Sequence, residues 1–465
     1  MLKRNELVQG LGVYGAVSVV AGTMIGTAIF VVPSVMLAEV RTAPRVLLVW
    51  LVAGMLSLFG ALGYAELGAA LPQAGGEYVY LYHAYGRSLG FLYAWTQFIV
   101  AKSASIAAIA TGFLLYLAFF FPALSDVIWH HSVSLAGWHL RLSLTGIQLG
   151  SAGMICLLSA LNVLGVRRSG AVQTAFTAAK LAVLATLIVA GLTLGHGSWA
   201  NFRSALSTHS AGGGALAGFG LAIIAALWAY DGWNNLSMVA GEVEKPQRNI
   251  PAALIGGALL VLLVYVAVNV AYFYLLRPSA IASTRTVAAL AAQQVMGPVG
   301  ASFIAVGVLV STFATLNGSI LSGSRIPYAC ARDTLFPQSL ARISPRFRTP
   351  AVAIIAQAVI SGVFALSGRY ETLYTKAIYS EWIFYGLVTA GLFVLRRREP
   401  RLVRPYRTWG YPVIPAVFVT SAAVLLVSAC FSSRKDVIWC LVLVGSGIPA
   451  YFCWSLAKRR TAGQK

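Results

Sequence analysis

The chain has 465 residues, of which 58% are hydrophobic and 10% are charged, and its mean hydropathy is +0.78. An ordinary soluble core does not need so much apolar sequence, so the composition excludes a soluble protein and indicates a polytopic membrane protein. The net charge of +21 is also typical of nucleic-acid-binding proteins, but the basic residues lie in short loops between apolar segments, where the positive-inside rule explains them.

Twelve apolar segments follow one another along the chain, each at least about 18 residues long, the length that crosses about 30 Å of hydrocarbon. They cover residues 11–37, 44–71, 89–121, 142–163, 171–194, 215–241, 252–276, 298–324, 350–367, 377–395, 412–431 and 436–457. No small-residue cleavage site follows the basic N-terminus, so we expect no removed signal peptide. The sequence therefore predicts an all-α polytopic membrane protein with twelve transmembrane helices in one domain, residues 1–465.

The first segment weakens its own helix near the middle. Residues 20–30 read VAGTMIGTAIF, where two glycines lower the helix propensity and two threonine hydroxyls compete for backbone groups. The sixth segment is interrupted over residues 225–235, AALWAYDGWNN, which place Asp231, Gly232 and two asparagines in an apolar span. Backbone freed from a helix at this depth is tolerated only where protein or a water-filled cavity satisfies it. Helices 1 and 6 are therefore predicted to be broken.

The two predicted breaks divide the chain into halves. Segments 1–5 and 6–10 each open on a broken helix, and an odd number of segments per half gives the halves opposite topology. We predict a 5+5 inverted repeat, with repeat A at about residues 11–194 and repeat B at about 215–395. The last two helices, at about 412–457, are expected to brace or pair rather than carry substrate. Interrupted helices at matching places in two repeats point to a transporter's binding site.

The loops predict an orientation and the partners. Most of the 34 lysines and arginines fall on the side of the N-terminus, which places both termini in the cytoplasm and the protein in the plasma (inner) membrane. No cysteine lies in a predicted external loop, so we expect no structural disulfide. All six histidines fall in loops, so no metal site, cofactor or histidine relay is expected within the membrane. The expected partners are the lipid bilayer and a small substrate, a homo-oligomer is compatible with the sequence, and no nucleic acid is expected.

The chemistry of the two breaks favours a zwitterionic ligand. The N–H groups that open the second half of helix 1, around Thr27 and Ala28, suit a carboxylate. Unpaired carbonyls suit an ammonium, and they are expected at Met24, Ile25, Trp228, Ala229 and Asp231, in a segment that also holds Tyr230. A ligand that carries both groups a few ångströms apart is an α-amino acid. The bulky ring of Trp228 is placed to close the pocket, and an apolar packing role is the alternative.

Two lysines lie deep in predicted helices. Lys180 is about nine residues, and so roughly 14 Å, inside helix 5, too far for its side chain to reach water easily. We interpret its ammonium as a replacement for the metal ion of a cation-coupled transporter, tying broken helix 1 to helix 8, which argues against sodium coupling. A purely structural lysine bonded to carbonyls is the alternative. Lys102 of helix 3 and Asn234 of helix 6 are candidates for the substrate pathway, and for Lys102 a stabilising contact to a helix end fits equally well.

Three other polar features receive structural interpretations. Glu66, near the cytoplasmic end of helix 2, is expected to pin an interface or a loop. Glu381, at the start of helix 10, is expected to face the outer interface. Four tyrosines before helix 3 predict an interfacial aromatic belt, namely Tyr78, Tyr80, Tyr82 and Tyr85. No Ser–His–Asp constellation and no H-E-x-x-H motif is readable, so we do not expect an enzyme.

Several stretches resemble a known superfamily. They are GTMIGTAIFVVP, YAELGAALPQAGGEYVYL, AYDGWNNLSMVAGEVEKPQRNIPAAL, SRIPYACARDTLFP and PYRTWGYPVIP. This specific set extends over nearly the whole chain and resembles the amino acid–polyamine–organocation superfamily, most closely the L-type amino acid transporters and their bacterial relatives. The resemblance implies the five-plus-five fold and alternating access. It also implies a carboxylate site at Gly26, Thr27 and Ala28, ammonium-binding carbonyls at Met24, Trp228 and Asp231, a gate at Trp228, the helix 5 lysine at Lys180 and its hydroxyl partner at Ser319.

The chain departs from this family in three places. The family usually has Gly-Ser-Gly where this chain has Gly26, Thr27 and Ala28, so the methyl group of Ala28 crowds the carboxylate end. Asp231 occupies a position where glycine or serine is common in animal members. Asp231 could cap the half-helix, bind a cationic group or, when protonated, carry coupling. Animal members bond a single-span glycoprotein through a cysteine after helix 3, and residues 122–141 contain none, so no disulfide-linked heavy subunit is expected.

Together these features predict a secondary active transporter of small to medium neutral L-amino acids that works by exchange or with protons. The alternative is a cationic amino acid or polyamine carrier, which Asp231 favours. A channel or an amino acid sensor on the same fold is the alternative of a different class.

Overall fold

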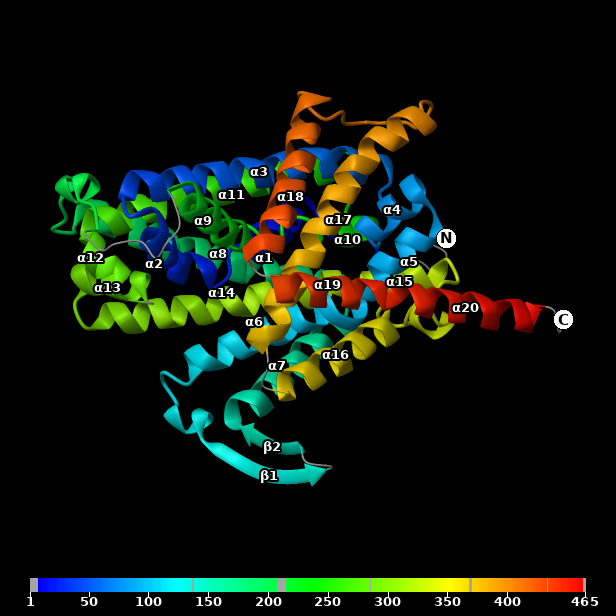
Figure 1. Ribbon diagram of the computed structural model, residues 1–465, viewed down its shortest axis with the longest axis horizontal. Coiled ribbons are helices and arrows are strands. Elements are labelled where there is room, and N and C mark those ends of the chain that lie inside the picture. Colours follow the sequence, from blue (N-terminus) through cyan, green and yellow to red (C-terminus); the bar gives the residue numbers. More distant parts are fainter. Residues whose placement is uncertain are drawn as a thin grey trace.

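The computed structural model describes residues 7–135, 138–206, 215–284, 286–367, 370–432 and 434–462. The first half contains α1 (Val13–Met24), α2 (Ala28–Val40), α3 (Ala43–Ala70), α4 (Glu77–Tyr85), α5 (Arg87–Thr96), η1 (Gln97–Ala101), α6 (Lys102–Leu117), η2 (Pro122–Ser125), β1 (Val127–Leu135), β2 (Trp138–Thr145), α7 (Gly146–Val163), α8 (Val166–Thr193) and η3 (Trp199–Arg203). Most long helices run along the long axis of the molecule, and α17 crosses them (Figure 1).

The second half contains α9 (Ala215–Ala229), α10 (Asn235–Met238), η4 (Ala240–Glu242), α11 (Pro246–Leu275), α12 (Pro278–Ala282), α13 (Val287–Met296), α14 (Val299–Gly323), α15 (Arg325–Arg332), η5 (Gln338–Ala341), α16 (Ala351–Leu366), α17 (Tyr370–Arg398), α18 (Val413–Ser432), α19 (Arg434–Gly445) and α20 (Gly447–Ala462). By length and apolar composition, eight helices in the described ranges can cross a membrane, or nine when the bent pair α1–α2 counts as one span. The predicted polytopic helical membrane protein is confirmed, while the count of twelve helices and the division into inverted repeats stay predictions.

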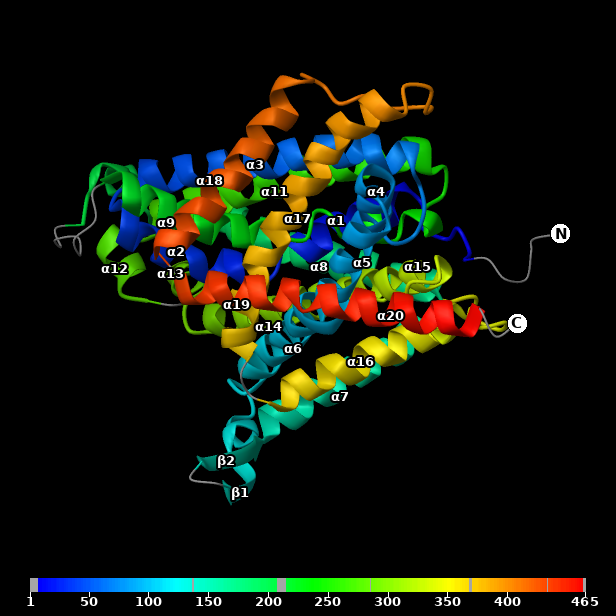
Figure 2. The ribbon, with the colours of Figure 1, turned by 45° about the vertical axis from the view of Figure 1, so that its right-hand side comes forward.

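The connection between α6 and α7 contains two strands that the sequence did not predict. Here β1 and β2 pair as an antiparallel two-stranded sheet that projects from the helical body (Figures 1 and 2). The stretch WHLRLSLT in β2 alternates apolar and polar residues, the pattern of a strand. The fourth predicted segment therefore starts as a strand, and its helix begins at Gly146, where the Thr145 hydroxyl accepts a hydrogen bond from the Gln148 N–H at 3.3 Å.

Both predicted helix breaks are present, and they face each other. Helix α1 ends at Met24 and α2 begins at Ala28, with an angle of 42° between them. Helix α9 ends at Ala229, and a turn leads to the short α10, which begins at Asn235. The Tyr265 hydroxyl of α11 lies 2.9 Å from the Met24 carbonyl oxygen and 3.0 Å from the Ala229 carbonyl oxygen. One side chain therefore joins the two breaks.

Gly232 allows the second break to approach the first. Its φ of +102° is a conformation that L side chains rarely adopt, and a Cβ atom there would lie 3.0 Å from the Thr23 carbonyl carbon. In return, the Thr23 hydroxyl donates a hydrogen bond to the Gly232 carbonyl at 2.8 Å. Any larger residue at position 232 would separate the two breaks.

Glu66 pins a loop, as predicted. Its carboxylate accepts hydrogen bonds from the Arg396 guanidinium at 2.6 Å and 2.9 Å and from the Thr408 N–H at 2.7 Å. These bonds hold the segment that follows α17 against α3. The predicted aromatic belt is wrong for Tyr78 and Tyr80, which are each 1% exposed, because α4 packs inside the protein rather than at a lipid boundary.

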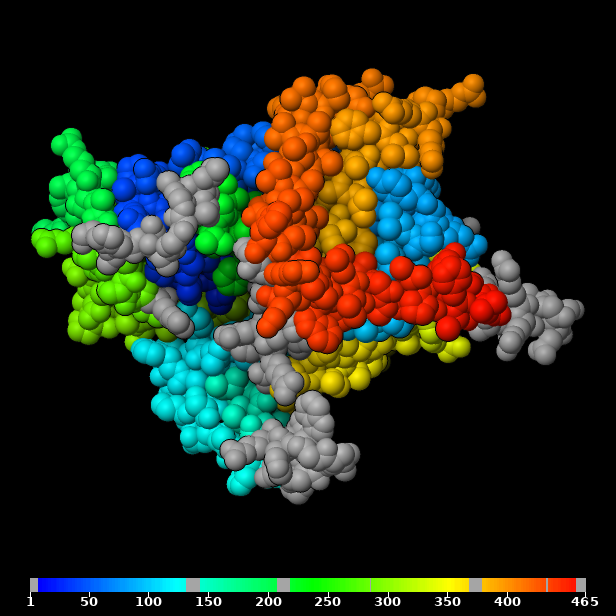
Figure 3. Space-filling view, in the orientation of Figure 1, coloured from blue at the N-terminus to red at the C-terminus, as the bar shows by residue number. Residues whose placement is uncertain are grey.

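The last helices lie on the outside of the molecule. Helices α18, α19 and α20 run across one face (Figure 3) and expose large apolar side chains such as Phe431 and Phe452. This position agrees with a bracing role away from the breaks. The chain enters α1 and leaves α20 on one side of the molecule, called the terminus side below, and α12 and α13 lie on the opposite, far side (Figure 2).

Candidate functional site

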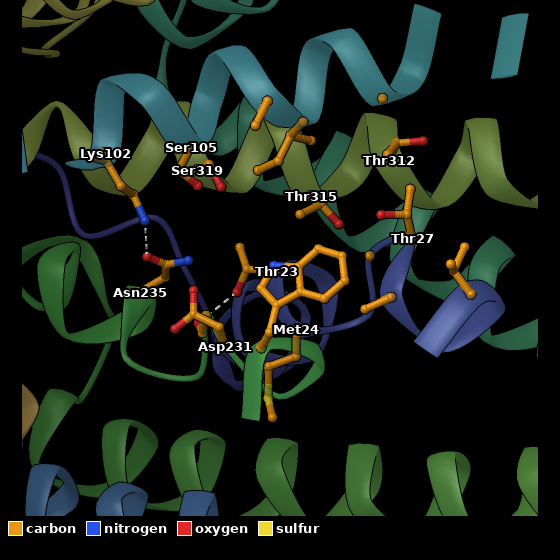
Figure 4. A pocket seen from close by; sticks show the side chains of 18 of the residues that line it. Thr23, Met24, Thr27, Lys102, Ser105, Asp231, Asn235, Thr312, Thr315 and Ser319 are labelled. Carbon is orange, nitrogen blue, oxygen red and sulfur yellow. Dashed lines mark hydrogen bonds between the residues drawn. The ribbon is translucent and has the colours of Figure 1, made fainter. Parts of the chain in front are cut away.

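A cavity of about 640 Å³ lies between the two helix breaks (Figure 4). Its volume is in the range of pockets that enclose small molecules. Its walls come from α1, α2, α6, α9, the turn after α9, α10, α14 and α17. Of the predicted site residues, Met24, Gly26, Thr27, Ala28, Lys102, Trp228, Asp231 and Ser319 line the cavity, whereas Ile25, Lys180, Ala229, Tyr230 and Asn234 lie behind its surface.

The N-terminus of α2 borders this cavity. Thr27 precedes the helix without a side-chain cap, and both Thr27 and Ala28 line the cavity wall. Among the described residues, no acceptor bonds to the N–H groups of Thr27, Ala28 or Ile29. A helix N-terminus with available donors and a positive dipole end suits a carboxylate.

The Ile25 carbonyl was predicted to bind an ammonium, and the structure corrects this assignment. It accepts hydrogen bonds from the Ser311 hydroxyl at 2.7 Å, the Lys180 ammonium at 2.7 Å and the Thr315 hydroxyl at 3.2 Å. These donors come from α8 and α14; Lys180 and Ser311 lie behind the cavity wall, and Thr315 is part of it. The Ile25 carbonyl therefore stabilises the unwound segment and is not available to a ligand.

Three further predicted residues also form bonds inside the protein. The Ala229 carbonyl is engaged by Tyr265, as described above. The Tyr230 hydroxyl donates to a backbone carbonyl of α3 at 3.1 Å, and the Asn234 amide donates to the Glu77 carboxylate. These residues support the turn between α9 and α10, and the structure corrects their assignment to the cavity surface.

Lys180 joins α8 to the two helices that the sequence predicted. Its side chain is 1% exposed. The ammonium donates to the Gly22 carbonyl at 2.8 Å and the Ile25 carbonyl at 2.7 Å in the first span, and to the Ser311 carbonyl at 3.0 Å and the Thr315 hydroxyl at 3.3 Å in α14. Protein oxygens therefore surround this ammonium, as they would surround a hard metal cation.

The hydroxyl partner of Lys180 is Thr315 and not Ser319. Ser319 lies about one turn further along α14, where it lines the cavity. A displacement of four residues keeps a side chain on the same face of a helix but moves it about 6 Å along the axis. The family resemblance thus identified the correct helix and face but the wrong turn.

Trp228 lies in the last turn of α9 and lines the cavity, where its ring was predicted to close the pocket. We expect Trp228→Ala to widen the side-chain region, so that bulkier amino acids compete better or exchange slows by about tenfold. Competition profiles and exchange rates in proteoliposomes measure both effects. The matched control is Trp409→Ala, since this ring is 72% exposed outside the cavity. If the competition profiles and exchange rates of Trp228→Ala are unchanged, this residue only packs against its neighbours and does not close the pocket.

Lys102 lies at the cavity wall directly after a π-helical turn. This turn, η1, precedes α6, and such turns are frequent at functional sites. The Lys102 ammonium donates to the Asn235 amide oxygen at 2.5 Å, and Asp231 lies close by (Figure 4). The Asp231 carboxylate accepts a hydrogen bond from the Tyr385 hydroxyl of α17 at 2.8 Å. Lys102 therefore contacts the broken sixth helix and faces the cavity at the same time.

Glu381 is buried, contrary to the prediction that it faces the outer interface. It is 9% exposed and lies one turn before Tyr385, whose hydroxyl donates to the Asp231 carboxylate. Helix α17 begins at Tyr370 and not at residue 377, so Glu381 lies roughly 16 Å along this helix. The error in the predicted helix start concealed the burial of this residue.

The terminus side of the cavity is closed by buried contacts. Arg325 of α15 and Glu242 of η4 form an ion pair at 2.6 Å, with both side chains fully buried. The Glu242 carbonyl accepts hydrogen bonds from the N–H groups of Gly10 and Leu11, each at 3.0 Å, which attaches the segment before α1. Beyond the breaks, the cavity lining continues along α2, α6 and α9. The cavity is therefore sealed toward the terminus side.

Residues 11–448 match the family model described as "Amino acid permease". The chain belongs to the amino acid permease family. The permease is 33% identical over 456 residues to the human b(0,+)-type amino acid transporter 1, covering 97% of this chain and 88% of that protein. It is 32% identical over 462 residues to the serine/threonine exchanger SteT of Bacillus subtilis, covering 98% of this chain and 99% of the exchanger. It is 29% identical over 439 residues to the human cystine/glutamate transporter, covering 94% of this chain and 83% of that transporter.

These matches confirm the resemblance to the amino acid–polyamine–organocation superfamily that the motifs indicated. The relatives are transporters of amino acids, so the permease is a multi-pass membrane transporter of amino acids and not an enzyme.

Several residues of its site were not predicted, namely Thr315, Ser311, Tyr265, Asn235, Tyr385 and Glu381. Asn235 and Tyr265 could have been noticed as polar residues in otherwise apolar segments, whereas the roles of the others depend on helix packing.

Proposed function

We propose that this permease exchanges small to medium neutral L-amino acids across the plasma membrane by alternating access, without sodium. The observation that carries the proposal is the cavity between the two helix breaks, with the available N–H groups of α2 on its wall. Those groups suit the substrate carboxylate. Apolar residues of α2, α6 and α9 supply the side-chain region, including Val31, Ile109 and Ile224.

The position of Lys180 supports sodium independence. Its ammonium is bonded to oxygens of the first span and α14, so a metal ion there would compete with a fixed positive charge. Exchange is supported by the serine/threonine exchanger among the relatives. With both termini in the cytoplasm, the closed terminus side makes this an outward-facing conformation. We also propose that the permease works without a disulfide-linked subunit, since residues 122–141 contain no cysteine.

A cationic amino acid is the second candidate substrate. Asp231 lines the cavity, so a cationic side chain in the cavity could pair with its carboxylate. The apolar residues of α2, α6 and α9 that line the same cavity support the neutral class instead. A channel or an amino acid sensor on the same fold is the alternative of a different class.

Counterflow in proteoliposomes separates these candidates. We expect unlabelled alanine inside the vesicles to stimulate uptake of labelled alanine and leucine. The stimulation should be equal in sodium and in choline buffer, because the Lys180 ammonium takes the place of a sodium ion. Arginine uptake that alanine does not inhibit would support the cationic carrier. A channel would show no stimulation by internal substrate, and a sensor would show binding without uptake. Loss of uptake in choline buffer would contradict the sodium-independent mechanism.

A further inference from the structure

A second, smaller groove lies on the surface of the helical body, away from the cavity between the helix breaks. Its volume is about 250 Å³, and its walls come from α5, η1, the segment 336–340 and α20. Its lining side chains are all apolar or aromatic, and none of them lines the cavity between the breaks. Trp95, Ala450 and Trp454 are partly exposed, so the groove opens to the outside.

Two hydrogen bonds hold α20 beside α5 and leave space between them. The Trp95 indole N–H donates to the Ser446 hydroxyl at 3.1 Å, and the Trp454 indole N–H donates to the Thr334 carbonyl at 3.2 Å. Ala450 lies one turn from both Ser446 and Trp454, on the same face of the helix. Because its side chain is a single methyl group, the space between the two attachment points is not filled.

The surface around the groove is apolar. Ile448, Phe452 and Leu456 of α20 are each more than half exposed. Large apolar side chains on the outside of a membrane protein face the hydrocarbon of the bilayer. The groove is therefore accessible to an acyl chain.

Basic residues lie at the terminus-side end of the groove. Arg87 is the exposed first residue of α5 and lies one turn before Phe91, which lines the groove. Helix α20 runs toward the terminus side (Figure 2), where it reaches Lys458 one turn after Trp454. The same helix continues with two arginines, so its end is a basic cluster.

The described acidic residues do not neutralise this end of the groove. The three ion pairs in the described ranges involve other arginines than Arg87 and the exposed Arg342, which follows η5. Asp333 lies in the segment between α15 and η5, and its carboxylate accepts a hydrogen bond from the Tyr78 hydroxyl at 2.7 Å. A positive charge therefore remains for a ligand outside the protein.

We propose that this groove binds an anionic phospholipid of the leaflet on the terminus side. One acyl chain lies between α5 and α20, and the phosphate lies at Arg87 and the basic end of α20. An apolar slot with a basic end matches a molecule with a hydrocarbon tail and a negative head group, and basic pockets between transmembrane helices bind such head groups. The site is separate from the amino acid cavity and does not depend on the proposed function.

Lipid binding to the purified, delipidated permease tests this by native mass spectrometry. Phosphatidylglycerol and phosphatidylcholine with the same acyl chains are titrated separately. We expect at least one phosphatidylglycerol to bind about fivefold or more tightly than phosphatidylcholine, because each basic residue near the head group contributes about a factor of five and the choline cation opposes it. Glycerol phosphate, which has no acyl chain, should not displace the lipid. Equal binding of the two lipids, or displacement by glycerol phosphate, would overturn the site.

Variants separate the acyl chain from the head group. Ala450→Trp fills the groove and should weaken phosphatidylglycerol binding at least about tenfold, whereas Ala416→Trp, the same change on an exposed face of α18, should not alter it.

Arg87→Gln, a surface change that leaves the groove intact, should raise the Kd for phosphatidylglycerol about fivefold and leave that for phosphatidylcholine constant. Arg434→Gln, at the exposed start of α19, is its control. Phosphatidylglycerol binding that neither Ala450→Trp nor Arg87→Gln weakens would refute the proposal. A dimer that Ala450→Trp abolishes, without such lipid binding, would assign the groove to a second copy of the chain instead.

Discussion

Lys180→Ala is expected to reduce amino acid exchange by at least about 100-fold, since it removes several hydrogen bonds from a charged donor, each worth about 1.5–3 kcal/mol, and 1.4 kcal/mol is a factor of ten. The ammonium bonds to the Gly22 carbonyl in the last turn of α1, to the Ile25 carbonyl in the unwound segment and to the Ser311 carbonyl of α14. Its removal takes away the connection between α8 and both carbonyls, so the unwound segment keeps only the α14 hydroxyls as support and the N–H groups at the start of α2 are held less firmly. Counterflow of labelled alanine measures the effect.

The variant should still be inserted and folded. The Ser311 and Thr315 hydroxyls continue to bond the Ile25 carbonyl, so the break keeps part of its support. Size-exclusion chromatography in detergent and thermal melting check folding. The matched control is Lys435→Ala, because Lys435 is exposed in α19 and its replacement should leave exchange unchanged. Normal exchange in Lys180→Ala would show that this lysine does not organise the site.

The helix breaks could be predicted because their causes are local. Glycines, threonines and an aspartate inside apolar spans lower helix stability wherever the helix packs, and the structure has its breaks at residues 25–27 and 230–234. The depth of Lys180 in its helix also follows from counting residues. Such inferences need only the chain itself and the thickness of a bilayer.

The partners across the breaks could not be predicted because they depend on how helices pack. Thr315 and Ser319 lie on one face of α14, and the height of α8 beside it decides which of them meets Lys180. Glu381 was assigned to an interface because the polar residues around it obscured the start of α17. The Ile25 carbonyl was expected to face a ligand, but backbone orientation in an unwound segment is fixed by the donors that surround it.

Arg325→Ala is expected to open the terminus side of the cavity. Removing one partner of a buried ion pair leaves an uncompensated charge and costs about 3–5 kcal/mol. Here the remaining charge is Glu242, whose segment also holds the chain before α1. The closed arrangement should become less favourable, with slower exchange and a lower Tm. Cys330, which is fully buried in α15, reports the opening by its reaction with a maleimide, after Ser replaces the other four cysteines, Cys156, Cys430, Cys440 and Cys453.

A second variant separates the unpaired charge from simple loss of packing. The combined variant Glu242→Gln with Arg325→Ala has the same loss of packing at position 325 but should melt at a higher temperature and label more slowly at Cys330 than Arg325→Ala alone, because no buried charge remains unpaired. Arg332→Ala is the matched control, since Arg332 is exposed at the end of the same helix and should leave both readouts unchanged. If Cys330 stays unreactive in Arg325→Ala, the ion pair does not hold this side closed, and the contacts of Gly10 and Leu11 with Glu242 are sufficient to seal it.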